Sequence, residues 1–321
     1  MAKLSRPRRG SLQYWPRKRA KKIIPSVNWG AISLKNQDKK ILGFICYKVG
    51  MMSAHAKDNT PDSMTKNKRV VFPVTILECP PLKISSVRFY KNKKIATEIL
   101  STNIDKELKK IAKFPKQSQD NSSKLDTIKD YDDMRIIVYS TIKKTGLKHK
   151  PDVIELAISG NLDEKMTFVK EHLNKEIKIS EVFGKMQMVD VHAVTKGKGY
   201  QGAVKRFGIG LRSHKAEKGV RRPGSLGPWH PARVTFRTPE AGQLGFFTRV
   251  SYNSKIIDFG NISEKNINPS SGFKHFGNIK SDYIILRGSV HGVVKRPIIL
   301  THTLRKTKYQ DKKNFDLIEL R

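Results

Sequence analysis

The chain has 321 residues and a formal net charge of +36, with 64 Lys or Arg against 28 Asp or Glu. Its 37% hydrophobic content supports a folded core that leaves much of the chain outside it, and such an excess of cations predicts an anionic partner. Two cysteines, Cys46 and Cys79, exclude a disulfide framework and a cysteine zinc site, and no run of 18 apolar residues offers a membrane span, so we expect a cytosolic protein.

The chain begins with a basic arm. Residues 1–24 hold nine Lys or Arg and no carboxylate, so this segment cannot fold alone. The composition fits an arm that threads through RNA, and it fits equally a disordered basic tail or a nuclear localisation run. The candidate RNA-binding residues of the arm are Arg6, Arg8, Arg9, Arg17, Lys18 and Arg19.

Strand-like segments follow the arm and reappear near the C-terminus. The runs KILGFICYKVGMM, RVVFPVTILEC and KISSVRFY come first, and MQMVDVHAV, GFFTRVSYN, YIILRGSVHGVV and IILTHTL come later, with Pro297 at an edge or a strand start. Many short strands on both sides of an insertion predict one closed β-domain. We expect a mainly β fold with an α/β insertion, in the form of a β-barrel with long basic extensions.

The insertion between the two groups of strands is close to neutral. Residues 98–190 hold 17 basic and 16 acidic residues, whereas the rest of the chain holds 47 and 12. The runs starting at Ile104 and Asn161 have helical periodicity, the second with Asn161 and Glu164 as a capping pair, and RIIVYSTI and VIELAIS between them indicate strands. This division of charge is typical of a nucleic-acid binder that carries an inserted neutral domain.

The most informative segment is residues 196–233. It carries ten Lys or Arg, eight Gly and a single carboxylate, Glu217, and it has no periodicity that would bury a face. A structureless segment of this length is a functional loop or a disordered one, and its cations require a phosphate backbone or a similar anion. The candidate RNA-binding residues here are Lys196, Lys198, Lys205, Arg206, Arg212, His214, Lys215, Arg221, Arg222, Trp229, His230 and Arg233.

The glycines of this segment permit two interpretations. Gly197 to Gly202 match G-x-G-x-x-G, the fingerprint of a dinucleotide site, but that site needs a long helix, and Gly208 and Gly210 interrupt the sequence that follows. We prefer the interpretation that the glycines let the backbone approach a phosphate or turn sharply. The glycines expected to do so are Gly197, Gly199, Gly202, Gly208 and Gly227.

Two side chains in the basic segment stand out. Trp229, in GPWHPA, either folds back onto the barrel or packs among nucleotides, and His214 either stacks on a base or is simply solvated. The nine histidines contain no H-E-x-x-H and no spacing with cysteines, so we expect no metal. We expect no catalytic residue, no cofactor and no small-molecule substrate.

Several segments resemble one family. KGKGYQG…RFG, RRPGSLGPWHPARV and AGQLGFFTRVSYN, together with PRRGSLQYWPRKRAKK, GFICYKVGMM and PVTILECPPL, resemble large-subunit ribosomal protein L-three in its archaeal and eukaryotic branch. The resemblance extends from Ser5 to about Arg296. Size, arm and insertion look archaeal, because bacterial relatives lack the insertion.

The resemblance implies a fold and a function. The fold would be a translation-protein β-barrel with two extensions inside large-subunit ribosomal RNA. Residues 196–233 would reach toward the peptidyl transferase centre, with Trp229 near the region where aminoacyl-tRNA enters, and the arm would thread between RNA helices. The protein would bind early in assembly, near the 3′ end of the RNA, beside other large-subunit proteins of the L-fourteen and L-twenty-four type.

These observations predict a domain division and a function. The hypothesis is a non-catalytic constituent of the large ribosomal subunit, in the cytoplasm, that binds ribosomal RNA. A nucleotide-cofactor enzyme using Gly197–Gly202, or a general basic condenser of nucleic acid, are the alternatives. The expected division is an arm at 1–30, barrel parts at 31–97 and 234–321, the α/β insertion at 98–181, a barrel strand at 182–195 and the basic central extension at 196–233.

Overall fold

The computed structural model describes residues 10–36, 41–102, 104–115, 122–128, 130–229 and 232–321. The chain divides into two units. The first, here called the extension unit, consists of Met1–Lys22 and Val194–Arg249, and the second, the sheet unit, consists of Ile23–Ala193 and Val250–Arg321.

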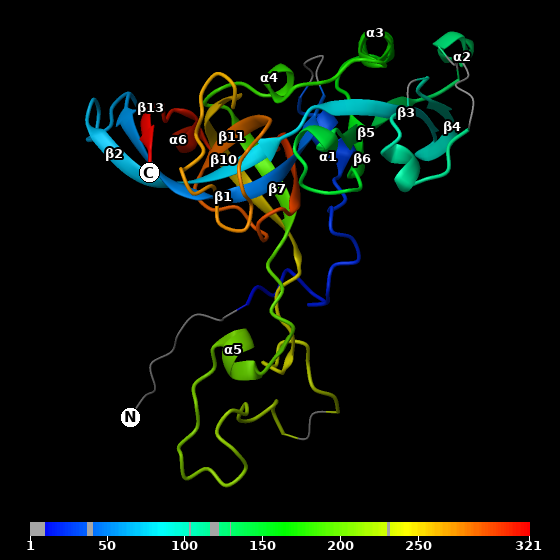
Figure 1. The fold of residues 1–321 in the computed structure, drawn as a ribbon. Coiled ribbons are helices and arrows are strands. Elements are labelled where there is room, and N and C mark those ends of the chain that lie inside the picture. Colours follow the sequence, from blue (N-terminus) through cyan, green and yellow to red (C-terminus); the bar gives the residue numbers. More distant parts are fainter. Residues whose placement is uncertain (1–9, 37–40, 103, 116–121, 129, 230–231) are drawn as a thin grey trace. The chain divides into compact units, whose positions relative to one another are not determined.

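The sheet unit contains a seven-stranded antiparallel sheet. Its hydrogen-bonded order is β12-β7-β10-β11-β2-β1-β13, and β1 also pairs with β12. The fold is mainly β, as predicted, and Figure 1 shows these strands gathered together. Their bounds are β1 (Gly43–Asp58), β2 (Arg69–Cys79), β7 (Met188–Val194), β10 (Thr248–Asn261), β11 (Asp282–Arg287), β12 (Pro297–His302) and β13 (Phe315–Leu320).

Strand β1 lies at the centre of the core. Tyr47 on β1 stands opposite Glu78 on β2 and opposite Pro297 on β12, so this part of β1 has a neighbour on each edge. Phe44, Ile45 and Tyr47 are fully buried, as expected for a strand rich in aromatic and β-branched residues. Pro297 is the first residue of β12, in agreement with its predicted position at a strand start.

A second, four-stranded sheet has the order β4-β3-β5-β6. Its strands are β3 (Leu82–Lys91), β4 (Lys94–Leu100), β5 (Asp133–Ser140) and β6 (Val153–Ala157). β3 and the first four residues of β4 fall in the range 31–97 expected to belong to the barrel, but β3 pairs with β5 from Leu82 to Tyr90. The α/β part of the chain therefore begins near Leu82 rather than at residue 98.

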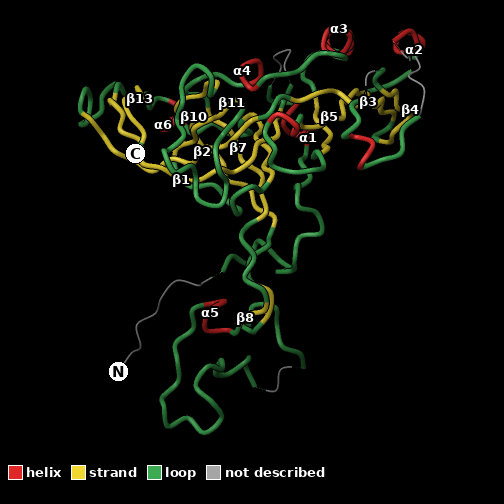
Figure 2. Tube along the Cα trace, in the orientation of Figure 1, coloured by secondary structure: helices red, strands yellow, loops and turns green. Residues whose placement is uncertain are grey.

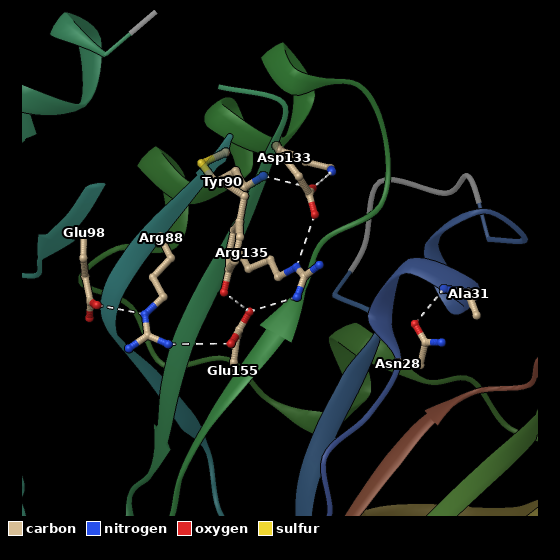
Figure 3. A network of polar contacts seen from close by, with 10 residues as sticks. Asn28, Ala31, Arg88, Tyr90, Glu98, Asp133, Arg135 and Glu155 are labelled. Atoms are coloured by element: carbon tan, nitrogen blue, oxygen red, sulfur yellow. Dashed lines mark hydrogen bonds and ion pairs between the residues drawn. The ribbon is translucent and has the colours of Figure 1, made fainter. Parts of the chain in front are cut away.

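Charged side chains connect the four strands of this sheet (Figure 3). Glu155 on β6 accepts from Arg135 Nη1 at 3.1 Å and from the Tyr90 hydroxyl at 2.6 Å, and its other oxygen lies 3.6 Å from Arg88 Nη1. Arg88 Nε also donates to Glu98 on β4 at 2.8 Å. Some of the acidic and basic residues that make this part of the chain nearly neutral therefore form ion pairs within its own sheet.

The helices are short. The predicted helix at Asn161 is confirmed as α3 (Leu162–His172), and the reciprocal hydrogen bonds between Asn161 and Glu164 form the predicted capping box. The predicted helix starting at Ile104 is wrong, because only a 3₁₀ turn, Leu108–Lys110, forms there. Leu108 is buried but Ile111 is 44% exposed, so the apolar face has too few buried residues to sustain a helix. The other helical segments are α1 (Trp29–Ser33), α2 (Ser122–Thr127), the 3₁₀ turn Ile142–Lys144, α4 (Ile179–Val182), α5 (Ala203–Phe207) and α6 (Lys308–Asp311).

The extension unit is mostly loop (Figure 2). Its regular elements are α5 and a two-residue ladder between β8 (Tyr200–Gln201) and β9 (Gly242–Gln243), together with the start of β10. In the described part of the chain no helix is long and apolar enough to cross a membrane.

Candidate nucleic-acid interface

The extension unit concentrates positive charge on exposed backbone. Residues 194–249 hold 12 Lys or Arg and only two carboxylates, Glu217 and Glu240. Nearly every described residue from Gly210 to Arg237 is exposed or half-buried. The described residues of this stretch therefore present their cations to solvent.

Two antiparallel segments, 194–201 and 242–249, form the stem of the unit. Thr195 N donates to Phe247 O at 2.9 Å, Lys198 N donates to Leu244 O at 2.9 Å, and Leu244 N returns a bond to Gly199 O at 2.9 Å. Since backbone groups supply these bonds, the side chains of Lys196 and Lys198 are left exposed. The stem is thus a scaffold that carries cations on its outside.

Gly245 permits the closest approach of the two segments. It is buried with φ +71°, and a Cβ built on it would lie 2.1 Å from the Lys196 carbonyl oxygen. Only glycine fits there, both for its backbone angle and for the lack of space. Gly199 also has a positive φ, +65°, but nothing lies within 4 Å of its Cβ position.

Helix α5 follows the stem and ends at once. Gly208 adopts the left-handed conformation at φ +63° and closes the helix after five residues. A dinucleotide site needs a long helix after its glycines, so this geometry does not provide one. Ala203 and Phe207 are the buried residues of the helix.

Arg206 is held by the protein. Its Nε donates to Gln243 O at 3.0 Å, and its Nη1 donates to Glu240 O at 2.9 Å. Burial lowers the pKa of Arg206 from its usual value. These bonds tie α5 to the returning segment, which gives this residue a structural role that its charge alone did not indicate.

The arm packs on the extension through cations and aromatic rings. The Arg17 guanidinium lies 4.8 Å from the centroid of the Phe207 ring, and Arg19 lies 5.0 Å from that of Phe246. Ala20 N donates to Phe246 O at 2.9 Å. Two of the predicted RNA-binding arginines therefore position the arm as well.

A second group of rings extends this contact. Arg249 lies close to two aromatic rings, 4.2 Å from the centroid of Tyr14 and 5.0 Å from that of Phe247. Trp15 packs against Phe236 with ring centroids 5.2 Å apart. Phe207, Phe246 and Arg249 were not predicted from the sequence as positioning residues, although aromatic residues spaced among arginines were a signal for them.

The loop beyond α5 is shaped by turns. Arg212 N donates to Val220 O at 3.1 Å, and the Arg212 guanidinium also donates to Pro223 O. Thr238 Oγ1 donates to Leu226 O at 3.0 Å. Trp229 is 89% exposed and packs little of its ring within this unit.

The remaining expected residues fall into three groups. Arg6, Arg8, Arg9 and His230 lie outside the described residues. Arg17, Arg206, Arg212 and Gly208 are half-buried. Those with exposed side chains or backbone are Lys18, Arg19, Lys196, Lys198, Lys205, His214, Lys215, Arg221, Arg222, Trp229, Arg233, Gly197, Gly199, Gly202 and Gly227.

The chemistry that this unit can perform follows from its side chains. Within the described ranges, no group of three His, Cys, Asp or Glu side chains could hold a metal ion. The arrangement offers cations, an exposed indole and backbone amides on a narrow stem. Chemically it can bind phosphates and stack on bases.

The whole chain is similar to known proteins. It matches the family described as Ribosomal protein L3 over residues 1–321. A large ribosomal subunit protein uL3 of Methanocaldococcus jannaschii is 40% identical over 314 residues, which cover 94% of this chain and 92% of the relative. Proteins of the same name from Methanococcus aeolicus, 39% identical over 313 residues (94% of this chain, 92% of the relative), and from Archaeoglobus fulgidus, 40% identical over 316 residues (95% and 94%), are also similar.

Proposed function

The chain belongs to the ribosomal protein L3 family and is a structural, non-enzymatic constituent of the large subunit of the cytoplasmic ribosome; on this basis we propose that its extension unit is the part that enters large-subunit ribosomal RNA. The observation that carries the proposal is the stem. Backbone hydrogen bonds close it, so its lysines need no partner within it.

Phosphate contacts dominate the proposed interaction. The deep major groove of A-form RNA admits side chains poorly, so cations on a narrow stem gain most from phosphates and 2′-hydroxyls. Base contacts are expected at unpaired nucleotides, with Trp229 and His214 as the side chains that reach them. The family resemblance supports a path toward the peptidyl transferase centre, with Trp229 near the region where aminoacyl-tRNA enters.

The arm is proposed to enter RNA with the extension. Because Arg17 and Arg19 pack on rings of the extension, the two segments would bind RNA as one surface. Early assembly near the 3′ end of the RNA, and neighbours of the L-fourteen and L-twenty-four type, are further proposals from the family resemblance.

The sheet unit is proposed to be the translation-protein β-barrel. The order β12-β7-β10-β11-β2-β1, together with the pairing of β1 with β12, makes a closed circuit of six strands, which supports this proposal. The proposed domain division is the expected one with three changes: the arm ends at Lys22, the α/β part starts near Leu82, and the extension returns as far as Arg249.

The test measures how the affinity of the chain for RNA depends on salt concentration. The full chain carrying Lys196→Gln and Lys198→Gln is compared, in filter binding to purified large-subunit ribosomal RNA, with a control carrying Lys109→Gln and Lys110→Gln. The control lysines are exposed on the turn of the near-neutral part. We expect the slope of log affinity against log salt to fall by about 1–2 for the stem variant only, since each lost phosphate contact removes about 0.7–0.9.

Equal slopes in the two variants would refute the proposal. Binding of any unrelated RNA with the same affinity as ribosomal RNA would instead favour the condenser hypothesis. The companion measurement is sedimentation of a cell extract in high salt, where we expect the chain to remain with the large subunit.

A further inference from the structure

The sheet unit carries a second cationic surface, around α6 between β12 and β13. Residues 303–314 contain Arg305, Lys306, Lys308, Lys312 and Lys313, against one carboxylate, Asp311. These residues belong to the sheet unit. These five cations in a surface segment of twelve residues lie outside the stem, so the proposed role of the stem does not account for them.

A buried lysine on β10 holds the backbone of this segment through hydrogen bonds. Lys255 on β10 is only 4% exposed, and its Nζ donates to Gln310 O at 2.9 Å and to Asp311 O at 3.0 Å, and also to Lys313 O. Burial lowers the pKa of Lys255. A buried ammonium that satisfies three carbonyls holds the segment in one conformation, so the exposed cations are presented in a fixed arrangement.

An aromatic ring lies among these cations. Tyr309 is 71% exposed, and Lys313 Nζ lies 4.3 Å from its ring centroid. Beside Tyr309 opens a cavity of about 560 Å³, whose walls include Lys312, Phe72 and Phe315. Cavities of about 300–1,000 Å³ are the usual size for a small ligand, and a nucleotide falls within that range.

The apolar wall of the cavity is itself covered by a cation. Arg287 lies 5.1 Å from the ring centroid of Phe72 and 4.9 Å from that of Phe315. Its guanidinium therefore adds to the positive charge of the cavity, while the two buried rings form the apolar base beneath it and Tyr309 is the exposed ring. Rings interleaved with cations are the chemistry that binds single-stranded nucleic acid.

Two carboxylates, Asp58 and Asp62, line the cavity, and Asp58 is already satisfied. Asp58 is 4% exposed and accepts hydrogen bonds from Thr60 N at 2.9 Å, Ser63 Oγ at 3.0 Å and Thr65 Oγ1 at 2.5 Å. Burial acts to raise the pKa of Asp58, but these hydrogen bonds outweigh it and lower the pKa to about 2. Its charge is directed into its own loop, so the exposed Asp62 is the one carboxylate of the wall left to offset the cations Arg287, Lys312 and Lys313.

We propose that this cavity accepts one unpaired nucleotide of ribosomal RNA, with its base against Tyr309 and its phosphates on Lys312 and Lys313. The inference rests on the proposed function, since it takes the same RNA as the ligand. An apolar protein partner fits less well, because docking it would bury the cations of the rim without counter-charges.

The first test uses purified large subunits irradiated with ultraviolet light. After digestion, mass spectrometry identifies peptides of this chain that carry a nucleotide adduct. We expect an adduct on the peptide containing Tyr309. Its absence there while adducts form on the stem, or a chemical cross-link of Lys312 to another protein in its place, would overturn the inference and leave the proposed function standing.

The second test measures affinity of the full chain for purified large-subunit ribosomal RNA. Tyr309→Ala should weaken binding by about 5- to 150-fold, the range for one stacked base, without changing the salt slope, and Tyr309→Phe should restore it. Lys312→Gln with Lys313→Gln should lower the slope by about 1–2. The control is again Lys109→Gln with Lys110→Gln.

The outcomes separate the two proposals. If Lys196→Gln with Lys198→Gln weakens binding while the α6 variants match the control, the proposed function is supported and the nucleotide site is refuted. If Tyr309→Phe binds as weakly as Tyr309→Ala, the ring does not stack and the inference fails. If the full chain bound no ribosomal RNA, with or without these substitutions, both the proposed function and the nucleotide site would be refuted.

Discussion

Gly245→Ala is the strongest perturbation that the stem of the extension unit offers. Gly245 is buried at φ +71°, and the added methyl group would lie 2.1 Å from the backbone oxygen of Lys196. A backbone atom cannot rotate away as a side chain can, so the two segments of the stem must move apart. Gly199→Ala is the matched control, because its φ is +65° but its Cβ position is open for 4 Å.

The magnitude follows from the contacts that are lost. Alanine in the left-handed region costs about 1–2 kcal/mol, and both variants incur this cost. In Gly245→Ala the separation also breaks or lengthens the bonds from Phe246 N to Lys196 O and from Lys198 N to Leu244 O. At about 0.5–1.5 kcal/mol for each bond, the difference between the variants is about 1–3 kcal/mol.

The assay is amide hydrogen exchange of the stem peptides, measured by mass spectrometry in purified large subunits. A difference of about 1–3 kcal/mol in opening free energy appears as exchange about 5- to 150-fold faster in Gly245→Ala than in Gly199→Ala. Peptides of β1 serve as the internal control and should exchange alike in both. Equal stem exchange in the two variants would refute the argument that the close approach at Gly245 closes the stem.

Three further predictions concern the indole, the ion pairs and a buried histidine. Trp229→Ala should leave the thermal unfolding of the full chain unchanged, because the residue is 89% exposed, but should slow tRNA accommodation in a translation assay; normal rates would assign the indole no role there. Glu155→Gln leaves Arg88 and Arg135 without a shared anion and should lower the free energy of unfolding in denaturant by about 1–2 kcal/mol, and no change would mean that solvent screens these pairs. Burial lowers the pKa of His192 to about 4, so stability should fall as the pH drops from about 6.5 to about 4, by up to about 3 kcal/mol, and His192→Gln should flatten this dependence in a series of denaturant titrations.

The mainly β fold was predictable because its strands are rich in β-branched and aromatic residues. The extent of the second sheet was not, since β3 resembles the strands of the first sheet in composition and only its partner strand decides where it belongs. The helix expected at Ile104 failed for a similar reason. Periodicity shows an apolar face, but whether Ile111 finds a surface to cover depends on the rest of the fold.

The site was predictable in its charge and less so in its construction. Cations without an apolar pattern indicated the extension, whereas Arg206 could be separated from its neighbours only by the carbonyls that it reaches. Likewise Gly245 is one of several glycines in this part of the sequence. It is distinguished by its close approach to the carbonyl oxygen of Lys196, nearly fifty residues earlier in the chain.

The packing of Arg17 and Arg19 on Phe207 and Phe246 has a consequence for synthesis. The two parts of the extension unit are separated by most of the chain, so the arm leaves the translating ribosome long before its aromatic partners exist. At about 5–20 residues per second, the interval from Lys22 to Arg249 lasts about 10–45 s. During that time the nascent arm carries its positive charge before Phe207 and Phe246 have been made. Other nucleic acids of the cell can then compete with ribosomal RNA for binding to the arm.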